Sequence, residues 1–211
     1  MALKTFNGKA KASVKTILWK AIAGVKTVIW VSVAPPVYAT QNPSDKSANI
    51  SLSWGNLTAT NTMASWWAVR STIGVYSGKH YREHTIGTWP NWIIWIGNSS
   101  ASLSNYVGFD ANWYSYDWGG AGKINNNVFS SYGATWNTGA VIWVALDMDV
   151  GTLTFYKNGV SQWTAFTGLS GTFYAMTSLH KWTGNTVATA NFGATTLAYT
   201  PPAGFNPWLY T

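Results

Sequence analysis

After residue 47 the chain consists of short stretches in which apolar and polar residues alternate, separated by Gly, Asn, Asp, Ser and Pro. Alternation with a period of two predicts strands with one buried face, and evenly spaced turns predict a β-sandwich. We expect strands at residues 49–53, 66–73, 79–87, 91–97, 104–110, 140–147, 152–157, 171–180 and 186–192. The fold class that follows is all-β, an antiparallel β-sandwich.

The clearest local signal is a hairpin between residues 141 and 156. Apolar residues alternate along 141–146, residues 147–151 form a turn, and the alternation resumes in the return strand. Asn158-Gly159 follows and favours a type I′ turn, because both residues tolerate positive φ. Packing explains this pattern without a ligand.

The N-terminal 34 residues differ from the rest, because they contain three 11-residue units that begin at Leu3, Val14 and Val25. The units are LKTFNGKAKAS, VKTILWKAIAG and VKTVIWVSVAP, and their Val, Ile and Thr content favours short strands. One such unit cannot bury its own apolar face, so it must stack on its neighbours or on another chain. We therefore expect residues 1–34 to be an assembly arm that forms a homo-oligomer through Lys4, Lys15, Lys26, Val14, Val25, Ile17 and Val28.

Residues 35–47 are rich in Pro, Asn and Ser, which predicts a linker, and residues 48–211 are expected to form the sandwich with a C-terminal tail. The alternative for the N-terminus is an export signal, with a small-residue cleavage site at 37–39. Lys15, Lys20 and Lys26 interrupt its apolar run. No stretch reaches the ~18 apolar residues of a membrane-spanning helix, so we expect no membrane span.

Charge and composition narrow the range of partners. The net charge is +7, but the first 40 residues hold six lysines and no acid, so the rest of the chain carries only +1. A nearly neutral body argues against a nucleic-acid groove. The low share of charged residues, 9%, argues against long coiled coils, because they need charged solvent faces. The absence of cysteine excludes disulfides, a thiolate nucleophile and a Cys-ligated metal.

The stretch VIWVALDMDVGTLTFYKNGVSQWTAFTGLSGTFYAMTSL at 141–179 resembles the core signature of SPRY domains. Upstream, residues 77–81 are similar to the SGKxYWE strand of that family, although Arg82 stands where the family has Trp. Residues 98–110 and 191–193 also fit, so the resemblance covers about residues 48–195. It implies a bent two-sheet sandwich that binds partners through loops at one end and performs no catalysis.

The segment 198–205 and the Lys-rich repeats are similar to those of SPRY-containing bacteriophage and prophage proteins. This resemblance implies a structural protein of the virion, such as a tail fibre, tail-tip or surface-decoration subunit. Its arm would bind other virion subunits, and its SPRY domain would recognise a host-surface protein or glycan. The alternative is a secreted bacterial adhesin or surface protein with an N-terminal export signal.

Two motifs contain metal-ligating residue types without favouring a metal site. His80-Tyr81-Arg82-Glu83-His84 matches H-x-x-E-H, which requires a helix. On a strand the two histidines lie roughly 13 Å apart and Glu83 points to the other face. Asp147, Asp149 and Gly151 resemble part of a calcium loop whose distal Glu is missing. We expect no metal, no cofactor and no enzymatic activity; a glycan-cleaving enzyme is the alternative.

Loop residues rich in Tyr, Trp and Asn are the candidates for ligand binding. The segment 112–127 is turn-rich, and aromatic rings with amide groups suit sugar or protein surfaces. The alternative is that most of these aromatic rings cover the core of the sandwich. The candidate residues are Trp89, Trp92, Tyr114, Tyr116, Asp117, Asn125, Asn126, Asn127, Trp136 and Trp182.

Five tryptophans stand where glycine is expected. A Trp is poorly tolerated at a turn glycine, because such positions often need positive φ. We hypothesise that some of these codons, UGA for example, are decoded as Trp in place of Gly; the alternative is that the tryptophans are real and packed. They are Trp95, Trp143 and Trp163, by comparison with SPRY domains, and Trp19 and Trp30, by alignment with Gly8 of the first repeat.

Overall fold

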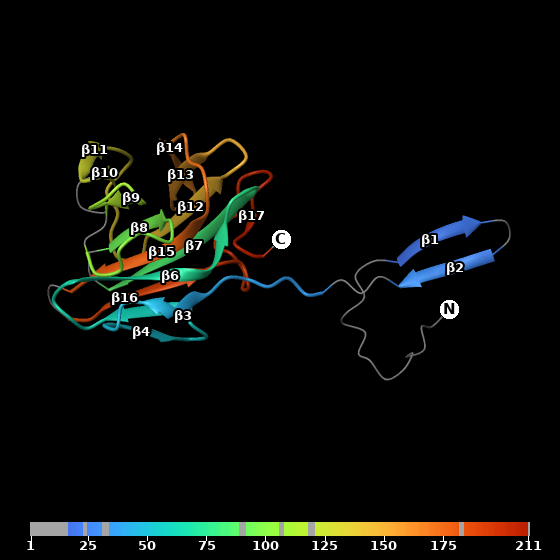
Figure 1. Cartoon of the computed structure of the whole chain (residues 1–211), viewed down its shortest axis with the longest axis horizontal. Coiled ribbons are helices and arrows are strands. Elements are labelled where there is room, and N and C mark those ends of the chain that lie inside the picture. The colour runs from blue at the N-terminus through green and yellow to red at the C-terminus, as the bar shows by residue number, and fades with distance from the viewer. Residues whose placement is uncertain are drawn as a thin grey trace. The chain divides into compact units, whose positions relative to one another are not determined.

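The computed structural model describes residues 17–22, 25–30, 34–88, 92–105, 108–117, 121–181 and 184–210. Within these ranges every regular element is a β-strand (Figure 1). The chain divides into two compact units, Met1–Val37 and Tyr38–Thr211.

The first unit contains one antiparallel hairpin of β1 (Ile17–Ile22) and β2 (Val25–Trp30). The two strands lie in the second and third 11-residue repeats, and the predicted arm residues Lys26 and Val28 are on β2. Two strands alone are marginally stable in water, so this hairpin needs further contacts. Three predicted arm residues lie outside the described part of the chain: Lys4, Val14 and Lys15.

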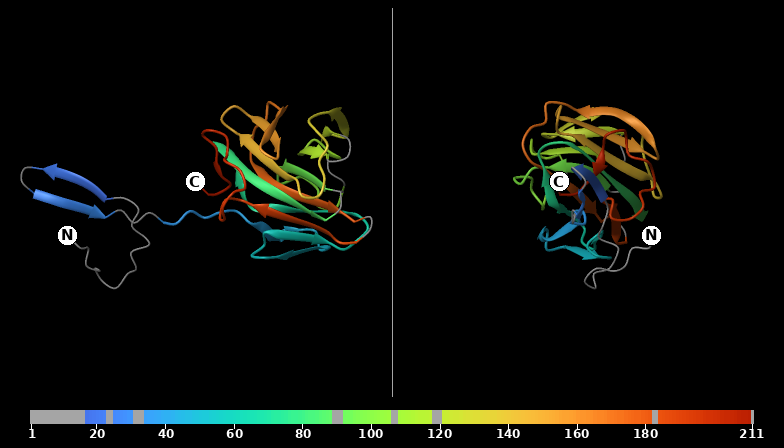
Figure 2. Two further views of the ribbon diagram at one scale, coloured as in Figure 1. Left: turned by 180° about the vertical axis from the view of Figure 1, so that it is seen from behind. Right: turned by 90° about the vertical axis from the view of Figure 1, so that its right-hand side faces the viewer.

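The second unit is a sandwich of two antiparallel sheets, which Figure 2 shows from two further sides. One sheet has the order β11-β10-β9-β8-β15-β6-β3. Its strands are β3 (Gln41–Lys46), β6 (Trp66–Val75), β8 (Trp92–Gly97), β9 (Trp113–Asp117), β10 (Gly122–Asn125), β11 (Val128–Ser131) and β15 (Phe173–His180).

The other sheet has the order β14-β13-β12-β7-β16-β5-β4, and a short strand pairs with β7 in parallel. The all-β, antiparallel sandwich predicted from the sequence is therefore confirmed. The strands of this sheet are β4 (Ile50–Ser53), β5 (Thr58–Asn61), β7 (Lys79–Thr88), β12 (Val141–Asp147), β13 (Thr152–Lys157), β14 (Val160–Phe166), β16 (Thr186–Asn191) and the parallel β17 (Asn206–Pro207).

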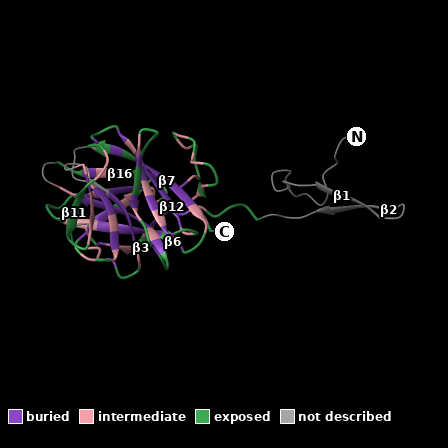
Figure 3. Cartoon of the chain, turned by 90° about the horizontal axis from the view of Figure 1, so that it is seen from above, coloured by how far each residue is buried: buried purple, intermediate pink, exposed green. Residues whose placement is uncertain are grey.

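Buried residues lie mostly along the strands of both sheets, and exposed residues are concentrated in the connections (Figure 3). The main core lies between the sheets and includes Val69 and Ile96 from one sheet and Val144 and Phe155 from the other. A smaller cluster packs around Trp95 and includes Trp113, Met176, Ala68 and Ala101.

Two sequence predictions about local structure were wrong. The described part of 104–110 is not a strand, because Asp110 Oδ1 accepts the Asn112 amide at 2.7 Å and such turns compete with strand pairing. Residues 41–46, predicted as linker, form the edge strand β3, and the compact unit begins at Tyr38. An edge strand tolerates Pro43, since its backbone need not donate to a neighbour there.

Candidate functional site

Connections between strands gather at two opposite ends of the sandwich, as the strand register shows. At one end Trp66 pairs with His180, and we call it the Trp66 end. At the other end Val75 pairs with Phe173, close to the start of β7, and we call it the His80 end. If the domain binds a ligand through loops at one end, the residues that contact the ligand must all lie at the Trp66 end or all at the His80 end.

The three predicted asparagines lie at the His80 end. Asn126 and Asn127 form the two-residue turn between β10 and β11, with φ of 51° and 58°. Asn125 Nδ2 donates to the carbonyl oxygen of Trp113 at 2.5 Å. Positive φ at both central positions is what a type I′ turn requires, so the turn itself accounts for these residues.

Other predicted residues belong to the Trp66 end. The register pairs Trp92 with Leu179 and Asp117 with Ile93, which places both predicted residues toward that end of their sheet. The sequence set therefore does not form one surface. Two further members, Trp89 and Trp182, lie outside the described residues.

Two of the predicted binding residues are core residues instead, so the prediction was wrong for them. Tyr116 and Trp136 are 0% and 1% exposed and fill the space between the sheets. Burial raises the pKa of Tyr116 to about 12, and its hydroxyl donates to the carbonyl oxygen of Ala134. Tyr114 is half-buried and packs edge-on against Phe166, with ring centroids 5.1 Å apart.

An exposed loop at the Trp66 end, residues 62–65, is held by the buried side chain of Asn61. Asn61 Nδ2 donates to the carbonyl oxygens of Ser65 at 2.9 Å and Leu179 at 2.8 Å, and Oδ1 accepts the Met63 amide at 2.8 Å. The loop is thereby tied to β15 while Met63 stays 51% exposed. An anchored loop with an exposed apolar tip is suited to protein contacts.

Beside this loop the rings of Trp66 and His180 are in contact, with their centroids 4.9 Å apart. Partial burial lowers the pKa of His180, which favours the neutral ring. Lys181 Nζ donates to the carbonyl oxygen of Thr62 at 2.8 Å and joins the loop to the end of β15. The Trp66 end thus combines an exposed thioether, an aromatic pair and a cation.

The His80 end is closed by the C-terminal segment. Trp208 is fully buried, and its indole nitrogen donates to the carbonyl oxygen of Ile73 at 3.1 Å. Tyr38 and Leu209 form an antiparallel bridge, so the sandwich unit begins at this end. The first residues of the unit and the candidate loop 62–65 therefore lie at opposite ends.

Aspartates in the β12–β13 turn hold the His80 end together. Asp149 Oδ1 accepts the Gly78 amide at 2.8 Å, and Asp147 pairs with Lys79 at 3.0 Å. The two aspartates of the D-x-D-x-G pattern therefore join the β12–β13 turn to the residues at the start of β7. Among the described residues no group of three or more His, Cys, Asp or Glu side chains is arranged to hold a metal ion.

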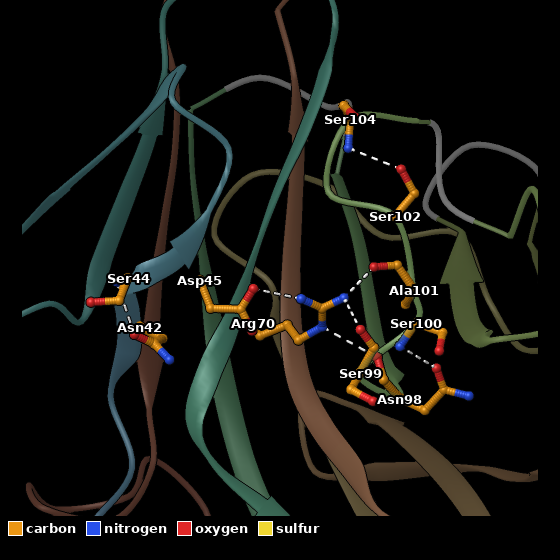
Figure 4. A network of polar contacts seen from close by, with 10 residues as sticks. All are labelled: Asn42, Ser44, Asp45, Arg70, Asn98, Ser99, Ser100, Ala101, Ser102 and Ser104. Carbon is orange, nitrogen blue, oxygen red and sulfur yellow. Dashed lines mark hydrogen bonds and ion pairs between the residues drawn. The ribbon is translucent and has the colours of Figure 1, made fainter.

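The β8–β9 connection is anchored on the sheet by Arg70 (Figure 4). Its guanidinium pairs with Asp45 at 2.6 Å and donates to the carbonyl oxygens of Asn98, Ser99 and Ala101. Arg70 is 6% exposed and Asp45 is 36% exposed, so a buried guanidinium joins β3, β6 and the long loop. These hydrogen bonds fix the position of the β8–β9 connection against the sheet.

The H-x-x-E-H segment lies on strand β7, as the sequence predicted. Glu83 accepts backbone amides of Ala198 and Tyr199 at 2.8 and 3.0 Å, which fastens the C-terminal segment to its sheet. His84 lies on the inner side beside Arg82, whose pKa burial lowers to about 9. Burial and this neighbouring charge lower the pKa of His84 well below its ordinary value.

The tryptophans at expected glycine positions differ in environment. Trp95 is fully buried against Trp113, and Trp143 stacks on Tyr156 with ring centroids 5.1 Å apart. Trp163 instead has a φ of 63° and is 74% exposed. Positive φ favours glycine, and of these three tryptophans only Trp163 has a positive φ. The side chains of Trp19 and Trp30 lie outside what the structure describes.

Comparisons with known proteins agree with this architecture. The SPRY domain model matches residues 79–195, more than half of the chain, and the chain therefore belongs to the SPRY domain family. It is similar to the SPRY domain of human HERC1, whose crystal structure aligns with a TM-score of 0.62 at 15% identity. That alignment covers 74% of this chain and 99% of the HERC1 domain, and it shows a common fold.

A curated relative is the ATP-dependent RNA helicase DDX1 of Xenopus laevis, 31% identical over 127 residues. The alignment covers 59% of this chain but only 17% of the helicase. Family membership indicates a protein-binding role, since SPRY domains are generally non-catalytic binding domains. Among the described residues no helix is long and apolar enough to span a membrane.

Sequence reasoning missed the residues that the fold gathers at the Trp66 end, namely Met63, Trp66 and His180. Met63 lies in the β5–β6 loop and Trp66 begins β6, whereas His180 ends β15, more than 110 positions later in the sequence. Composition singled out Tyr- and Asn-rich loops instead. A partial signal was present, because Asn61 in an otherwise strand-like segment predicts a polar side chain that holds a turn.

Proposed function

We propose that this chain is a non-enzymatic bacteriophage virion protein, a fibre, tail or surface-decoration subunit. Its N-terminal arm binds other virion subunits and forms a homo-oligomer. Its SPRY domain recognises a protein or glycan on the host surface through the Trp66 end. The protein is accordingly located on the extracellular particle.

The proposal rests on a difference between the two ends of the sandwich. The first residues of the sandwich unit pair with the C-terminal segment at the His80 end, through Tyr38 and Leu209. The loop 62–65 lies at the other end, where Met63 remains exposed. A domain that is attached to a particle at one end and binds a host molecule at the other needs this arrangement, with the chain entering at the His80 end and an exposed loop at the Trp66 end. The sequence similarity of the repeats and of segment 198–205 to phage proteins supports the virion setting.

Deletion of residues 1–34 tests the assembly role. We expect a folded, soluble SPRY domain that no longer joins phage particles, as measured by mass spectrometry of purified virions and by analytical ultracentrifugation. Unchanged incorporation of the deleted chain would refute the assembly role. Recovery of host-secreted material that begins after residue 39 would favour the adhesin alternative.

Substitution at the Trp66 end tests recognition. Met63→Ser combined with Lys181→Glu should weaken binding of the full chain to host cells at least tenfold, because an interface depends on a few central contacts. Val150→Ser is the matched control, since Val150 is 68% exposed at the His80 end. Equal loss in both variants, or in neither, would contradict recognition through the Trp66 end.

A further inference from the structure

The strand β11 forms one margin of its sheet, and all four of its residues are exposed (Figure 1). It pairs with β10 on one side and, in the described part of the sheet, has no strand on the other side. Two of its side chains are large and apolar, since Val128 is 60% exposed and Phe129 is 50% exposed. An exposed edge of this kind is a template for a further strand.

The hydrogen-bond pattern shows which backbone groups of β11 face outward. Tyr132 follows the strand directly, and its amide donates to the carbonyl oxygen of Ala121 on the β10 side at 2.7 Å. Hydrogen-bonded pairs alternate along an antiparallel ladder, so Ser130, two residues earlier, also faces β10. The N–H and C=O groups of Phe129 and Ser131 therefore point away from β10. The free side of β11 presents two donors and two acceptors to a new strand.

The other three edges of the two described sheets carry features that oppose strand addition. Strand β3 contains Pro43 and shifts its register against β6. Strand β14 shifts its register twice against β13. Beside β4, Lys46 Nζ donates to the carbonyl oxygen of Ile50 at 2.6 Å. Prolines, bulges and lysines are common means by which proteins protect an edge, and β11, with the sequence VFSS, has none of them.

The ring of Phe129 is held in place on this edge. It lies across Gly122 of β10, where a Cβ atom would collide with it. A ring that is fixed beforehand loses less conformational entropy when a partner binds. Lys123 of β10 lies opposite Ser130, but its ammonium group is bound to the carbonyl oxygen of Ala165 in the other sheet. The edge thus presents an ordered aromatic ring on an uncharged strand.

We propose that β11 pairs antiparallel with β11 of a second copy of this chain, about a two-fold axis that passes beside Ser130. In this register Phe129 of each copy lies opposite Ser131 of the other, so all four outward groups of each strand form hydrogen bonds. Both Phe129 rings lie on the same face of the joined sheet. A two-fold contact requires a self-complementary surface, and an uncharged strand meets its own copy without repulsion.

A second copy fits this edge better than an unrelated peptide. Peptides that add to a sheet edge gain specificity from pockets that take alternate side chains. The hollow that the structure describes is lined by residues 73–77, 80, 209 and 210, so β11 does not contribute to it. A second copy brings an edge of the same length and register, together with its own ordered Phe129 ring. The contact does not depend on the virion role, because it uses neither the arm nor the Trp66 end.

Amide exchange of the full chain, followed by nuclear magnetic resonance with ¹⁵N-labelled Phe and Ser, tests the pairing. At high protein concentration the Phe129 and Ser131 amides should exchange at least about tenfold more slowly in the wild type than in Ser130→Lys, which sets two lysines opposite each other. Ser53→Lys is the control, because Ser53 is exposed on the edge strand β4, and it should keep the protection. Oligomerisation through the arm does not protect these two amides.

Equally fast exchange in all three chains would overturn the proposal. Protection that appears only after purified particles are added would overturn it in favour of a different subunit as the partner of β11.

Disulfide cross-linking provides an independent measurement, because the chain contains no cysteine of its own. Residues directly opposite each other in a non-hydrogen-bonded pair have Cα atoms about 4.5 Å apart, within the roughly 4.4–6.8 Å that a disulfide spans. In oxidised glutathione, Ser130→Cys should therefore convert most of the full chain into a covalent dimer on a non-reducing gel, whereas Ser53→Cys should form little. Equal yields from the two variants, or no dimer from Ser130→Cys, would overturn the assignment.

Discussion

The two ends of the sandwich are built from similar connections but are closed by different means. At the His80 end a segment from the C-terminus inserts Trp208 between the sheets, and Asp149 clamps the neighbouring turn. At the Trp66 end the loop 62–65 is held by hydrogen bonds of the Asn61 and Lys181 side chains, and Met63 stays exposed. The comparison shows that a buried indole closes the His80 end, whereas the Trp66 end is tied by a few hydrogen bonds that leave the tip of its loop exposed.

Removal of the indole that closes the His80 end should have the largest effect. Trp208→Ala is expected to lower the free energy of unfolding by about 3–5 kcal/mol, because a fully buried ring is lost and a cavity remains. Urea denaturation of the full chain measures it. Met63→Ser at the Trp66 end should change the stability by less than about 0.5 kcal/mol. Similar losses in both variants would remove the contrast between the ends.

The attachment of the C-terminal segment to β7 depends on one carboxylate. Glu83→Gln should cost about 1–3 kcal/mol, because an amide nitrogen cannot accept the Ala198 and Tyr199 amides as the carboxylate does. Hydrogen exchange of these two amides should accelerate. Asp149→Asn is the control, since its remaining oxygen can still accept the Gly78 amide. Unchanged exchange in the Glu83 variant would show that the segment is held by other contacts.

The pH dependence of stability should distinguish the interior from the Trp66 end. The folded protein keeps the pKa of His84 far below its ordinary value of 6.5, whereas the unfolded chain restores it. Below pH 6.5 the unfolded state therefore binds more protons, and stability falls with falling pH by at most about 1.4 kcal/mol per pH unit from this group. His84→Gln should flatten that slope more than His180→Gln, because His84 is fully buried. Equal slopes in wild type and His84→Gln would contradict this origin.

The smallest effect is expected at an edge strand that closes neither end. Trp163→Gly should raise stability by about 1 kcal/mol, because glycine adopts the φ of 63° without the strain of a side chain. Trp95→Gly should be strongly destabilising, since it empties a buried position. Thermal unfolding measures both variants. A destabilised Trp163→Gly would mean that the exposed ring contributes to the fold.

The mass of the tryptic peptide that contains residue 163 provides the complementary measurement. A mass that corresponds to Gly would support decoding of that codon as glycine in the native host. A mass that corresponds to Trp would refute the hypothesis at this position, and the strained backbone would then be a real feature of β14.

Much of the fold was predictable because its signals are local. The alternation over 141–146 and the Asn158-Gly159 turn appear as β12, β13 and a turn with positive φ at both residues. Strand β3 escaped prediction, since Pro43 and its polar neighbours resemble a linker until β6 supplies a partner. The described part of 104–110 escaped for the opposite reason, because its composition favours a strand that side-chain hydrogen bonds prevent.

The candidate site was much less predictable than the fold. Tyr116 and Trp136 have the composition of a binding loop, yet both are core residues. Whether an aromatic ring faces solvent or the interior depends on which strands pair around it, and the pairing partners are distant in sequence.

The sequence by itself determined an all-β sandwich of the SPRY family, an N-terminal repeat region and a body with little net charge. These properties follow from alternation, turn residues and composition, which act over a few neighbouring positions. Only the tertiary structure decided that Trp208 closes one end, that Met63 is presented at the other, and that Glu83 holds the C-terminal segment. Those contacts join residues many positions apart, and no local pattern records which distant segments will meet.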